Sequence, residues 1–241
     1  MTMLRLEGIS HRFGGLEVLR NIDFSVSERE LIGLIGPNGA GKTTLFNVIT
    51  GFVHPFAGKV HLRGKDVTGY PAHRLVRLGL ARTFQGARVF ANMSIAECLA
   101  VARRKRAADA MRVAELDEIL GLLDLEKYMS DQASSLPSGL IRLLGIAMAL
   151  STGARLLLLD EPAAGLSAEE TEVLQRSIRR LNQIGVTIVV VDHNLQFVMG
   201  LVSRAIVLDA GRLIADGPPH AVTAEPHVIE AYIGGSDLAE D

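Results

Sequence analysis

The sequence contains a single cysteine, Cys98, among its 241 residues. One cysteine excludes a disulfide within the chain, and it excludes a metal site built from several cysteines. Scarce cysteine is typical of proteins kept in a reducing compartment, so we expect a cytoplasmic protein.

Long apolar runs are also absent. No window reaches the roughly 18 uninterrupted apolar residues that a membrane-spanning helix requires. The first ten residues, MTMLRLEGIS, carry charges where a signal peptide needs an apolar segment. Any role at a membrane is therefore expected to come through a partner protein.

An excess of charge of one sign is missing as well. The chain has 25 basic and 27 acidic side chains and a net charge of −2. Such a balance gives no broad attraction to nucleic acid or anionic lipid. The short basic run at residues 103–106 is typical of a solvated helix face, so we expect no nucleic-acid partner.

Four short apolar runs predict the central sheet. They cover residues 31–35, 155–160, 186–192 and 205–209. They are continuously apolar instead of alternating, which is typical of parallel strands covered on both faces. Between the second and third runs, the pair Ser167 and Glu170 predicts a capping box at a helix start, with Val173, Leu174, Ile178 and Leu181 as its apolar stripe and Gly185 as its end.

Two further regions differ from this pattern. The first 30 residues and residues 58–69 contain glycine turns and indicate short strands in a small antiparallel layer. Residues 88–150 lack such runs and have helical spacing, so we expect a helical insertion between core parts at 1–87 and 151–241. The length fits one α/β domain in which this insertion is a subdomain.

The stretch GPNGAGKTT, residues 36–44, fits the pattern of a phosphate-binding P-loop, G-x-x-x-x-G-K-[ST]. Its glycines allow close backbone approach to phosphates, Lys42 supplies a cation, and Thr43 is a candidate ligand for Mg²⁺. The predicted phosphate contacts are Gly36, Pro37, Asn38, Gly39, Ala40, Gly41, Lys42, Thr43 and Thr44. The fold class predicted is therefore α/β, with a P-loop NTPase (RecA-like) core, a mostly parallel sheet, a small antiparallel layer and a helical insertion.

In the stretch LLLLDEP, residues 156–162, two acids follow four leucines. Asp160 is a candidate to hold Mg²⁺ through water, and Glu161 is a candidate to orient and deprotonate an attacking water. Two acids after a strand are also common as a solvated strand end or a helix cap. Together with the P-loop they favour a nucleotide-hydrolysing site.

Two more polar residues have a role only if the fold brings them to the P-loop. His193 follows the run at 186–192, where a histidine is commonly a cap or solvated, unless its strand is next to the P-loop strand. In that case its imidazole can contact the γ-phosphate. Gln85 in ARTFQG is a weaker candidate, because a loop glutamine usually bonds to the backbone.

The segment SSLPSGLIRLLGIAMAL, residues 134–150, allows two interpretations. Its serines, Pro137 and Gly139 could open a helix whose free N–H groups attract an anion. The apolar residues that follow, interrupted only by Arg142, are equally typical of a buried core helix.

Taken in order, the P-loop, Gln85, LPSGL, LLLLDEP, AGLS and His193 resemble the ATP-binding cassette (ABC) family over essentially the whole chain. The sequence of these motifs is most similar to that of the ATPase subunits of bacterial branched-chain amino-acid importers. This resemblance implies an ATPase that uses ATP and Mg²⁺, with Asp160, Thr43 and Gln85 at the metal, Glu161, His193, Gln85 and Lys42 in catalysis, and Phe13 stacked on adenine.

The resemblance also implies partners and a location. A second cassette would pair head to tail with this one, and the pair would drive transmembrane permease subunits at the cytoplasmic face of the cell membrane. A periplasmic or extracellular solute-binding protein would take part indirectly. Gln85 and the helical insertion would carry motion to the permease.

LPSGL stands where the family has its signature, usually L-S-G-G-Q, which completes the ATP site of the partner cassette. Here Pro137 replaces the serine and Leu140 the glutamine, while Gly139 is retained and Ser138 is a candidate substitute for the lost hydroxyl. Losing one charge-assisted hydrogen bond to phosphate costs about 1.5–3 kcal/mol, so we expect two unequal sites and a heterodimer.

Two alternatives stay open at this point. One is a soluble ABC-type ATPase that acts on ribosomes or nucleic acid, which the near-neutral charge and the length disfavour. The other is a regulatory cassette that binds ATP with little turnover, which the altered signature favours and an intact Glu161 disfavours.

Overall fold

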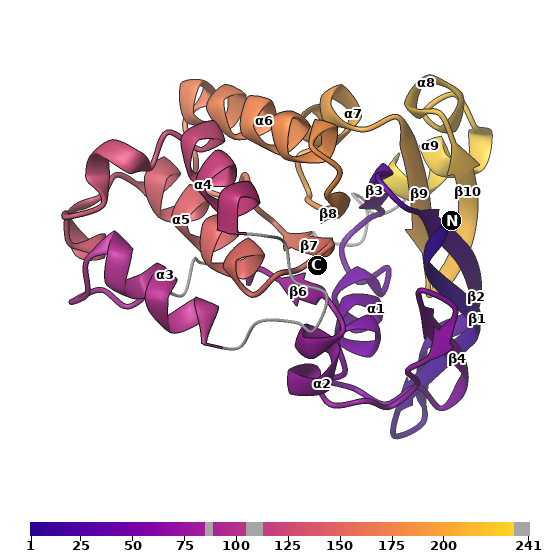
Figure 1. Cartoon of the computed structure of the whole chain (residues 1–241). Coiled ribbons are helices and arrows are strands. Elements are labelled where there is room, and N and C mark those ends of the chain that lie inside the picture. The colour runs from indigo at the N-terminus through magenta and orange to yellow at the C-terminus, as the bar shows by residue number, and fades with distance from the viewer. Residues whose placement is uncertain (85–88, 105–112, 234–241) are drawn as a thin grey trace.

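The computed structural model describes residues 1–84, 89–104 and 113–233, and within them two β-sheets organise the fold (Figure 1). The larger sheet has the strand order β10-β9-β3-β8-β7-β6. Its strands are β3 (Leu31–Ile35), β6 (Leu80–Arg82), β7 (Leu156–Asp160), β8 (Thr187–Val191), β9 (Arg204–Asp209) and β10 (Arg212–Gly217). Only the β9–β10 pair is antiparallel among these strands, so the four predicted parallel strands are confirmed.

The two faces of this sheet lie in two separate core clusters, which explains the continuous apolar runs. In β7, Leu157 and Leu159 pack with helices α5 (Ser138–Ser151) and α6 (Ala168–Gln183), whereas Leu156 and Leu158 pack on the opposite side with helix α1 (Lys42–Ile49). Because successive side chains of a strand point to opposite faces, burial on both faces leaves no position for a polar residue.

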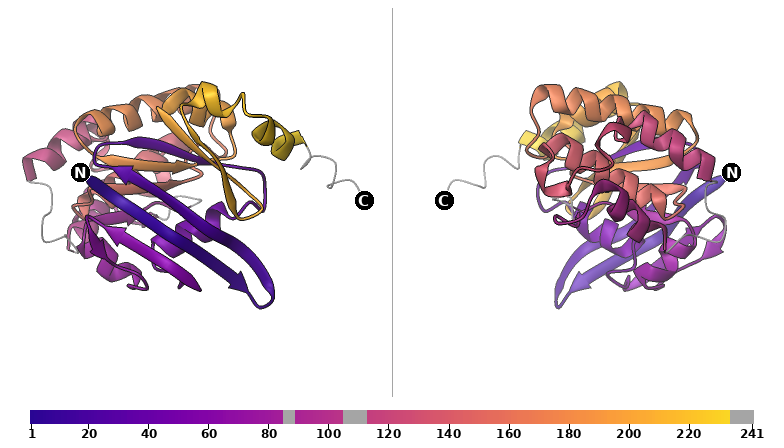
Figure 2. Two further views of the ribbon diagram at one scale, coloured as in Figure 1. Left: turned by 90° about the vertical axis from the view of Figure 1, so that its right-hand side faces the viewer. Right: turned by 60° about the vertical axis from the view of Figure 1, so that its left-hand side comes forward.

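The smaller sheet is antiparallel, with the order β2-β1-β4-β5, as predicted. Its strands are β1 (Thr2–Phe13), β2 (Leu16–Ser27), β4 (Ala57–Leu62) and β5 (Lys65–Asp66). The expectation of short strands at the N-terminus was wrong, because β1 and β2 have 12 residues each and form the long pair seen in Figure 2. Register shifts along the pair let the two strands stay hydrogen-bonded over this length.

Helix α1 (Lys42–Ile49) packs in the core cluster that contains residues of both sheets. The other helices are α2 (Ala72–Arg77), α3 (Ile95–Arg103), α4 (Val113–Leu122), α5 (Ser138–Ser151), α6 (Ala168–Gln183), α7 (Leu195–Leu201), α8 (Pro219–Val222) and α9 (Pro226–Ile233). Helices α5 and α6 cover the face of the large sheet opposite α1 (Figure 1).

Helix α6 begins and ends where the sequence predicts. The Ser167 hydroxyl accepts from the Glu170 N–H, and the Glu170 carboxylate accepts from the Ser167 N–H, so the capping box is confirmed. Three of the four predicted stripe residues are buried, and Val173 is half-buried. The helix ends at Gln183, just before Gly185 with φ of 104°.

Between β6 and β7, the described elements are helical. They are α3, α4, α5 and the 3₁₀ turns η1 (Glu126–Tyr128) and η2 (Ala133–Ser135). Their apolar residues join the cluster on the α6 side of the large sheet. The boundaries of a helical subdomain at 88–150 stay a prediction.

Candidate functional site: a phosphate loop and two acids at one sheet edge

The P-loop joins the end of β3 to the start of α1, as the sequence predicts. Gly36, with φ of 152°, lies so close to β9 that an added Cβ would be 2.1 Å from the Leu208 carbonyl oxygen. Gly41, with φ of 102°, is the N-cap of α1, and no side chain caps this helix. The loop backbone and the open start of α1 therefore form a cradle that only glycine allows at these points.

Lys42 folds back over the loop. Its Nζ donates to the Gly36 carbonyl at 2.7 Å and to the Pro37 carbonyl at 2.8 Å. Burial lowers the pKa of Lys42, while the charge of Glu161 acts in the opposite direction. The ammonium group is thus held at the mouth of the loop, where an incoming anion would compete with the two carbonyls.

The remaining predicted P-loop residues follow the same loop and helix start. Asn38, Gly39 and Thr43 are exposed, Thr44 is half-buried, and Ala40 is buried. The Ala40 N–H donates to the Pro37 carbonyl at 3.2 Å and tightens the turn.

The two acids lie at the end of β7, two strands from β3 in the sheet. The Asp160 carboxylate is nearly buried and forms an ion pair of 2.6 Å with Arg82. Glu161 has φ of 45°, in the left-handed region, and its N–H donates to the Val191 carbonyl of the neighbouring strand at 2.7 Å. Its side chain is about a quarter exposed, and it is close enough to Lys42 for its charge to raise the pKa of that lysine.

His193 meets the condition on which its role depended, because β8 pairs directly with β3. Its Nδ1 lies 3.8 Å from a Glu161 carboxylate oxygen and 3.7 Å from one of Asp192. The imidazole is exposed, whereas the Asp192 side chain is fully buried. Asp192 accepts from the N–H groups of Ala163 and Asn194, both at 2.9 Å, and so fixes the turn that presents the histidine.

The start of α5 is hydrogen-bonded to an acidic residue of α6. The Glu170 carboxylate accepts from the Ser138 hydroxyl at 2.8 Å and from the Gly139 N–H at 2.9 Å. Pro137 is the N-cap, not the first helical residue that a proline usually occupies. The helix also buries six of its residues, so both interpretations of segment 134–150 describe part of it.

The two other predicted residues lie apart from these groups. Phe13 stands at the tip of the β1–β2 hairpin with 54 % of its surface exposed, so it is not part of the core. Gln85 lies outside the described residues.

Sequence reasoning missed Arg82 and Tyr232. Arg82 ends β6, a strand of three residues that is too short for a pattern to show. Tyr232 lies in α9, where burial raises the pKa of its phenol and the Gly36 backbone of the P-loop acts in the opposite direction. A charged residue that directly follows two apolar ones before a candidate loop was the available signal for Arg82.

In the described ranges, no helix is long and apolar enough to cross a membrane, and no group of three His, Cys, Asp or Glu side chains could hold a metal ion.

Comparisons with known proteins agree with this geometry. Residues 19–164 match the family described as ABC transporter, and residues 212–237 match the branched-chain amino acid ATP-binding cassette transporter family. The chain is 36 % identical over 253 residues to the high-affinity branched-chain amino acid transport ATP-binding protein BraF of Pseudomonas aeruginosa, covering 96 % of this chain and 98 % of that protein. It is 38 % identical over 252 residues to LivG of Escherichia coli K12, with the same coverage.

Solved structures give the same result. The ADP conformation of an ATP-binding cassette of an ABC transporter superposes with a TM-score of 0.87 at 29 % identity, covering 97 % of this chain and 99 % of that one. A nucleotide-free ATP-binding cassette gives a TM-score of 0.86, covering 97 % and 100 %. The chain therefore belongs to the ABC transporter family, as one of its ATPases.

Proposed function

We propose that this chain is the ATP-hydrolysing subunit of an importer for branched-chain or related amino acids. The proposal rests mainly on the position of the P-loop, Glu161 and His193. All three follow the carboxyl ends of β3, β7 and β8, which are neighbouring strands of the large sheet. The solute is inferred from the relatives BraF and LivG, which are branched-chain amino acid transport ATP-binding proteins.

Residues 36–44 would hold the phosphates of ATP. The open N-terminus of α1 offers N–H donors and the positive end of the helix dipole. Lys42 would exchange its two carbonyl partners for phosphate oxygens, which accept a charge-assisted hydrogen bond more strongly than a carbonyl does. Phe13, exposed on its hairpin, would stack on the adenine.

The donor set fits Mg²⁺. This ion prefers oxygen ligands, keeps several waters and is usually bound by one or two carboxylates together with substrate phosphates. The exposed Thr43 hydroxyl and the Asp160 carboxylate would hold it, with Gln85 as a third candidate. When bound, the ion neutralises charge that develops on the phosphate oxygens.

Glu161 would act as the general base. Its charge raises the pKa of Lys42, and its carboxylate lies 3.8 Å from His193 Nδ1. It would orient a water and take its proton as the water attacks the γ-phosphorus. Lys42 and His193 would stabilise the charge that develops on the transferred group.

A second cassette would complete the site. In the described part of the chain, no hydrogen bond or ion pair joins Ser138 or Gly139 to residues 36–44. A signature segment that does not bond to its own P-loop fits a site shared between two chains. Because Pro137 and Leu140 lack the polar groups of the usual signature, we favour a partner of different sequence.

The pair would sit on transmembrane permease subunits at the cytoplasmic face of the membrane. A solute-binding protein outside the membrane would deliver the amino acid. ATP binding would close the two cassettes and product release would reopen them, with the helical segments after β6 carrying the motion.

The direct test is single-turnover hydrolysis by the assembled transporter with wild-type chain and with Glu161→Gln. We expect the variant to bind ATP with unchanged affinity and to hydrolyse it about 10²–10⁴ times more slowly, as expected for loss of a general base. Glu169→Gln, which removes an exposed acid of α6, is the matched control. Equal rates for wild type and Glu161→Gln would contradict the proposal.

A further inference from the structure

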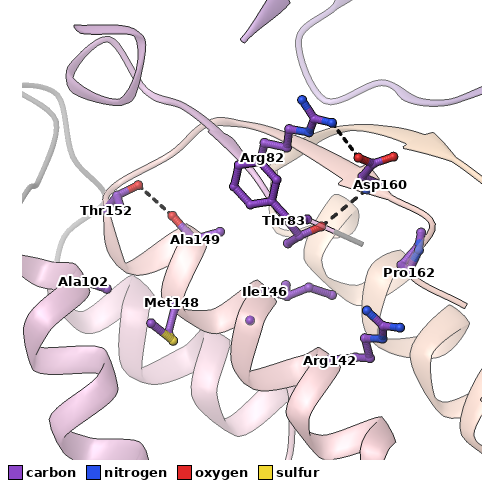
Figure 3. Close-up of a pocket in the computed structure, with 12 residues that line it drawn as sticks. Arg82, Thr83, Ala102, Arg142, Ile146, Met148, Ala149, Thr152, Asp160 and Pro162 are labelled. Carbon is purple, nitrogen blue, oxygen red and sulfur yellow. Dashed lines mark hydrogen bonds and ion pairs between the residues drawn. The ribbon is translucent and has the colours of Figure 1, made fainter. Parts of the chain in front are cut away.

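A buried arginine forms an ion pair with the acid proposed to hold the metal. The Arg82 side chain has 6 % of its surface exposed and the Asp160 side chain 10 %, and the two groups are 2.6 Å apart. Both side chains line a cavity of about 280 Å³ between the large sheet and helix α5. Figure 3 shows the two groups facing each other among the residues that line this cavity.

The guanidinium connects three elements. One of its NH2 groups donates to Asp160 Oδ2, and the other donates to Asn47 Oδ1 at 2.7 Å and to Thr50 Oγ at 3.2 Å. Asn47 belongs to α1, the helix that begins at the P-loop, and Thr50 is its C-cap. Arg82 therefore links the acid of β7 to the helix that carries Lys42 and Thr43.

Aromatic rings surround the same cation. Its central carbon lies 5.6 Å from the ring centre of Phe46, 6.0 Å from that of Phe52 and 5.1 Å from that of Phe84. Rings at this distance favour a cation and exclude water from it. A charge buried this deeply is stable only with a partner, so the pair fixes the Asp160 carboxylate in one orientation.

The pair leaves part of Asp160 available. Arg82 uses only Oδ2, and among the described residues no hydrogen bond to Oδ1 is found. The backbone is fixed as well, because the Asp160 N–H donates to the Thr83 hydroxyl at 3.4 Å and the Thr83 N–H donates to the Leu158 carbonyl at 2.9 Å. One oxygen is thus held by the protein and the other is left for a ligand.

We propose that Arg82 is a positioning residue for the metal, which fixes the Asp160 carboxylate relative to helix α1 so that its second oxygen faces the bound Mg²⁺ and its water shell. This inference rests on the proposed function, because it requires that Asp160 and Thr43 serve the same ion. Arg82 itself does not contact the nucleotide or the metal. Its effect is expected in the contribution of Mg²⁺ to nucleotide binding.

The experiment measures the Kd of a fluorescent ATP analogue in EDTA and in Mg²⁺, for wild type and for Arg82→Gln. Partners that orient metal ligands typically change metal affinity by roughly 10- to 100-fold when they are lost. Mg²⁺ tightens nucleotide binding, so the Kd in EDTA divided by the Kd in Mg²⁺ measures the contribution of the metal. We therefore expect this ratio to fall by about that factor in Arg82→Gln, while the Kd in EDTA stays close to that of wild type.

Arg204→Gln is the matched control. Arg204 is also a part-buried arginine with ion pairs, to Glu30 at 3.0 Å and Asp216 at 2.6 Å. It lies on β9, which does not pair with the strand β7 that carries Asp160. Replacing an arginine with a purely structural role should lower the melting temperature without changing the Kd ratio. That is the result expected for Arg204→Gln.

The possible outcomes separate the two proposals. A wild-type protein that binds no nucleotide contradicts the proposed function itself. A wild type with a normal Mg²⁺ effect and an Arg82→Gln variant with the same ratio overturns the role of Arg82 alone. If Arg82→Gln does not fold, Arg82→Lys decides the matter. It keeps the charge but not the planar fork that spans Asp160 and Asn47, so an unchanged ratio in that variant would also overturn the inference.

Discussion

The hydroxyl of Ser138 donates a hydrogen bond of 2.8 Å to the carboxylate of Glu170, across 32 positions of sequence and from one helix start to another. The same carboxylate oxygen accepts from the Gly139 N–H, and the second oxygen accepts from the Ser167 N–H. One acid therefore occupies the start of α5 and caps α6 at the same time. In the proposed dimer, a phosphate that approached α5 would meet this negative charge.

Glu170→Gln should lower the melting temperature at neutral pH. The pKa of Glu170 is lowered to about 2 from 4.5, chiefly by the Ser167 N–H, then by the Gly139 N–H and the Ser138 hydroxyl. Because this pKa is lowered on folding, the carboxylate stabilises the protein fully above about pH 4.5, and this contribution is lost as the pH falls toward 2. The difference between wild type and variant should therefore shrink over that range. Glu169→Gln is the control, and a difference that does not vary with pH would contradict this assignment.

Restoring the signature polarity should raise the ATPase rate of the assembled transporter. Pro137→Ser with Leu140→Gln returns a hydroxyl and an amide to the start of α5. Since one charge-assisted hydrogen bond is worth about 1.5–3 kcal/mol, the gain expected is about tenfold or more. Pro137→Ala with Leu140→Ala removes the same side chains without adding polar groups and should give no gain. A restored pair that is no faster than this control would count against the unequal-site proposal.

Lys42→Met should weaken ATP binding by at least about tenfold, since it removes a charge-assisted bond to phosphate and keeps the length of the side chain. Titration with a fluorescent ATP analogue measures the effect. Lys59→Met, which removes an exposed lysine from β4, is the matched control and should bind as wild type does. Equal affinities for the two variants would show that Lys42 does not contact the nucleotide.

Gly36→Ala should destabilise the fold more than Gly39→Ala does. The new Cβ at position 36 would be 2.1 Å from the Leu208 carbonyl oxygen, whereas at position 39 nothing lies within 4 Å. Overpacking of this kind costs about 1–3 kcal/mol, in addition to the backbone strain of about 1–2 kcal/mol that both glycines share through their positive φ. Urea denaturation gives the two free energies of unfolding, and a larger loss in Gly39→Ala would be the contrary result.

The predictable parts of this fold are those with local signals. The four apolar runs predicted the parallel strands because both faces of the sheet are buried, and the Ser167 and Glu170 pair predicted the start of α6 because a capping box involves only neighbouring residues. The family and the fold class inferred from the motifs are confirmed.

The remainder depends on contacts between distant residues. Arg82 and Asp160 are 78 positions apart, and nothing in either local sequence indicates the other. Glu170 has two roles, of which only the cap of its own helix could be inferred from spacing. The length of β1 and β2 was also missed, because their pairing tolerates register shifts that interrupt a regular pattern.

The proximity of Tyr232 to the P-loop gives the unlabelled protein an intrinsic fluorescent probe of nucleotide binding. The chain has no tryptophan and only three tyrosines, so tyrosine emission is not masked by a stronger fluorophore. The Gly36 backbone, at the first position of that loop, is close enough to Tyr232 to affect the pKa of its phenol. Nucleotide entry should therefore change the intrinsic fluorescence of the unlabelled protein, and replacing Tyr232 with phenylalanine should remove most of that signal.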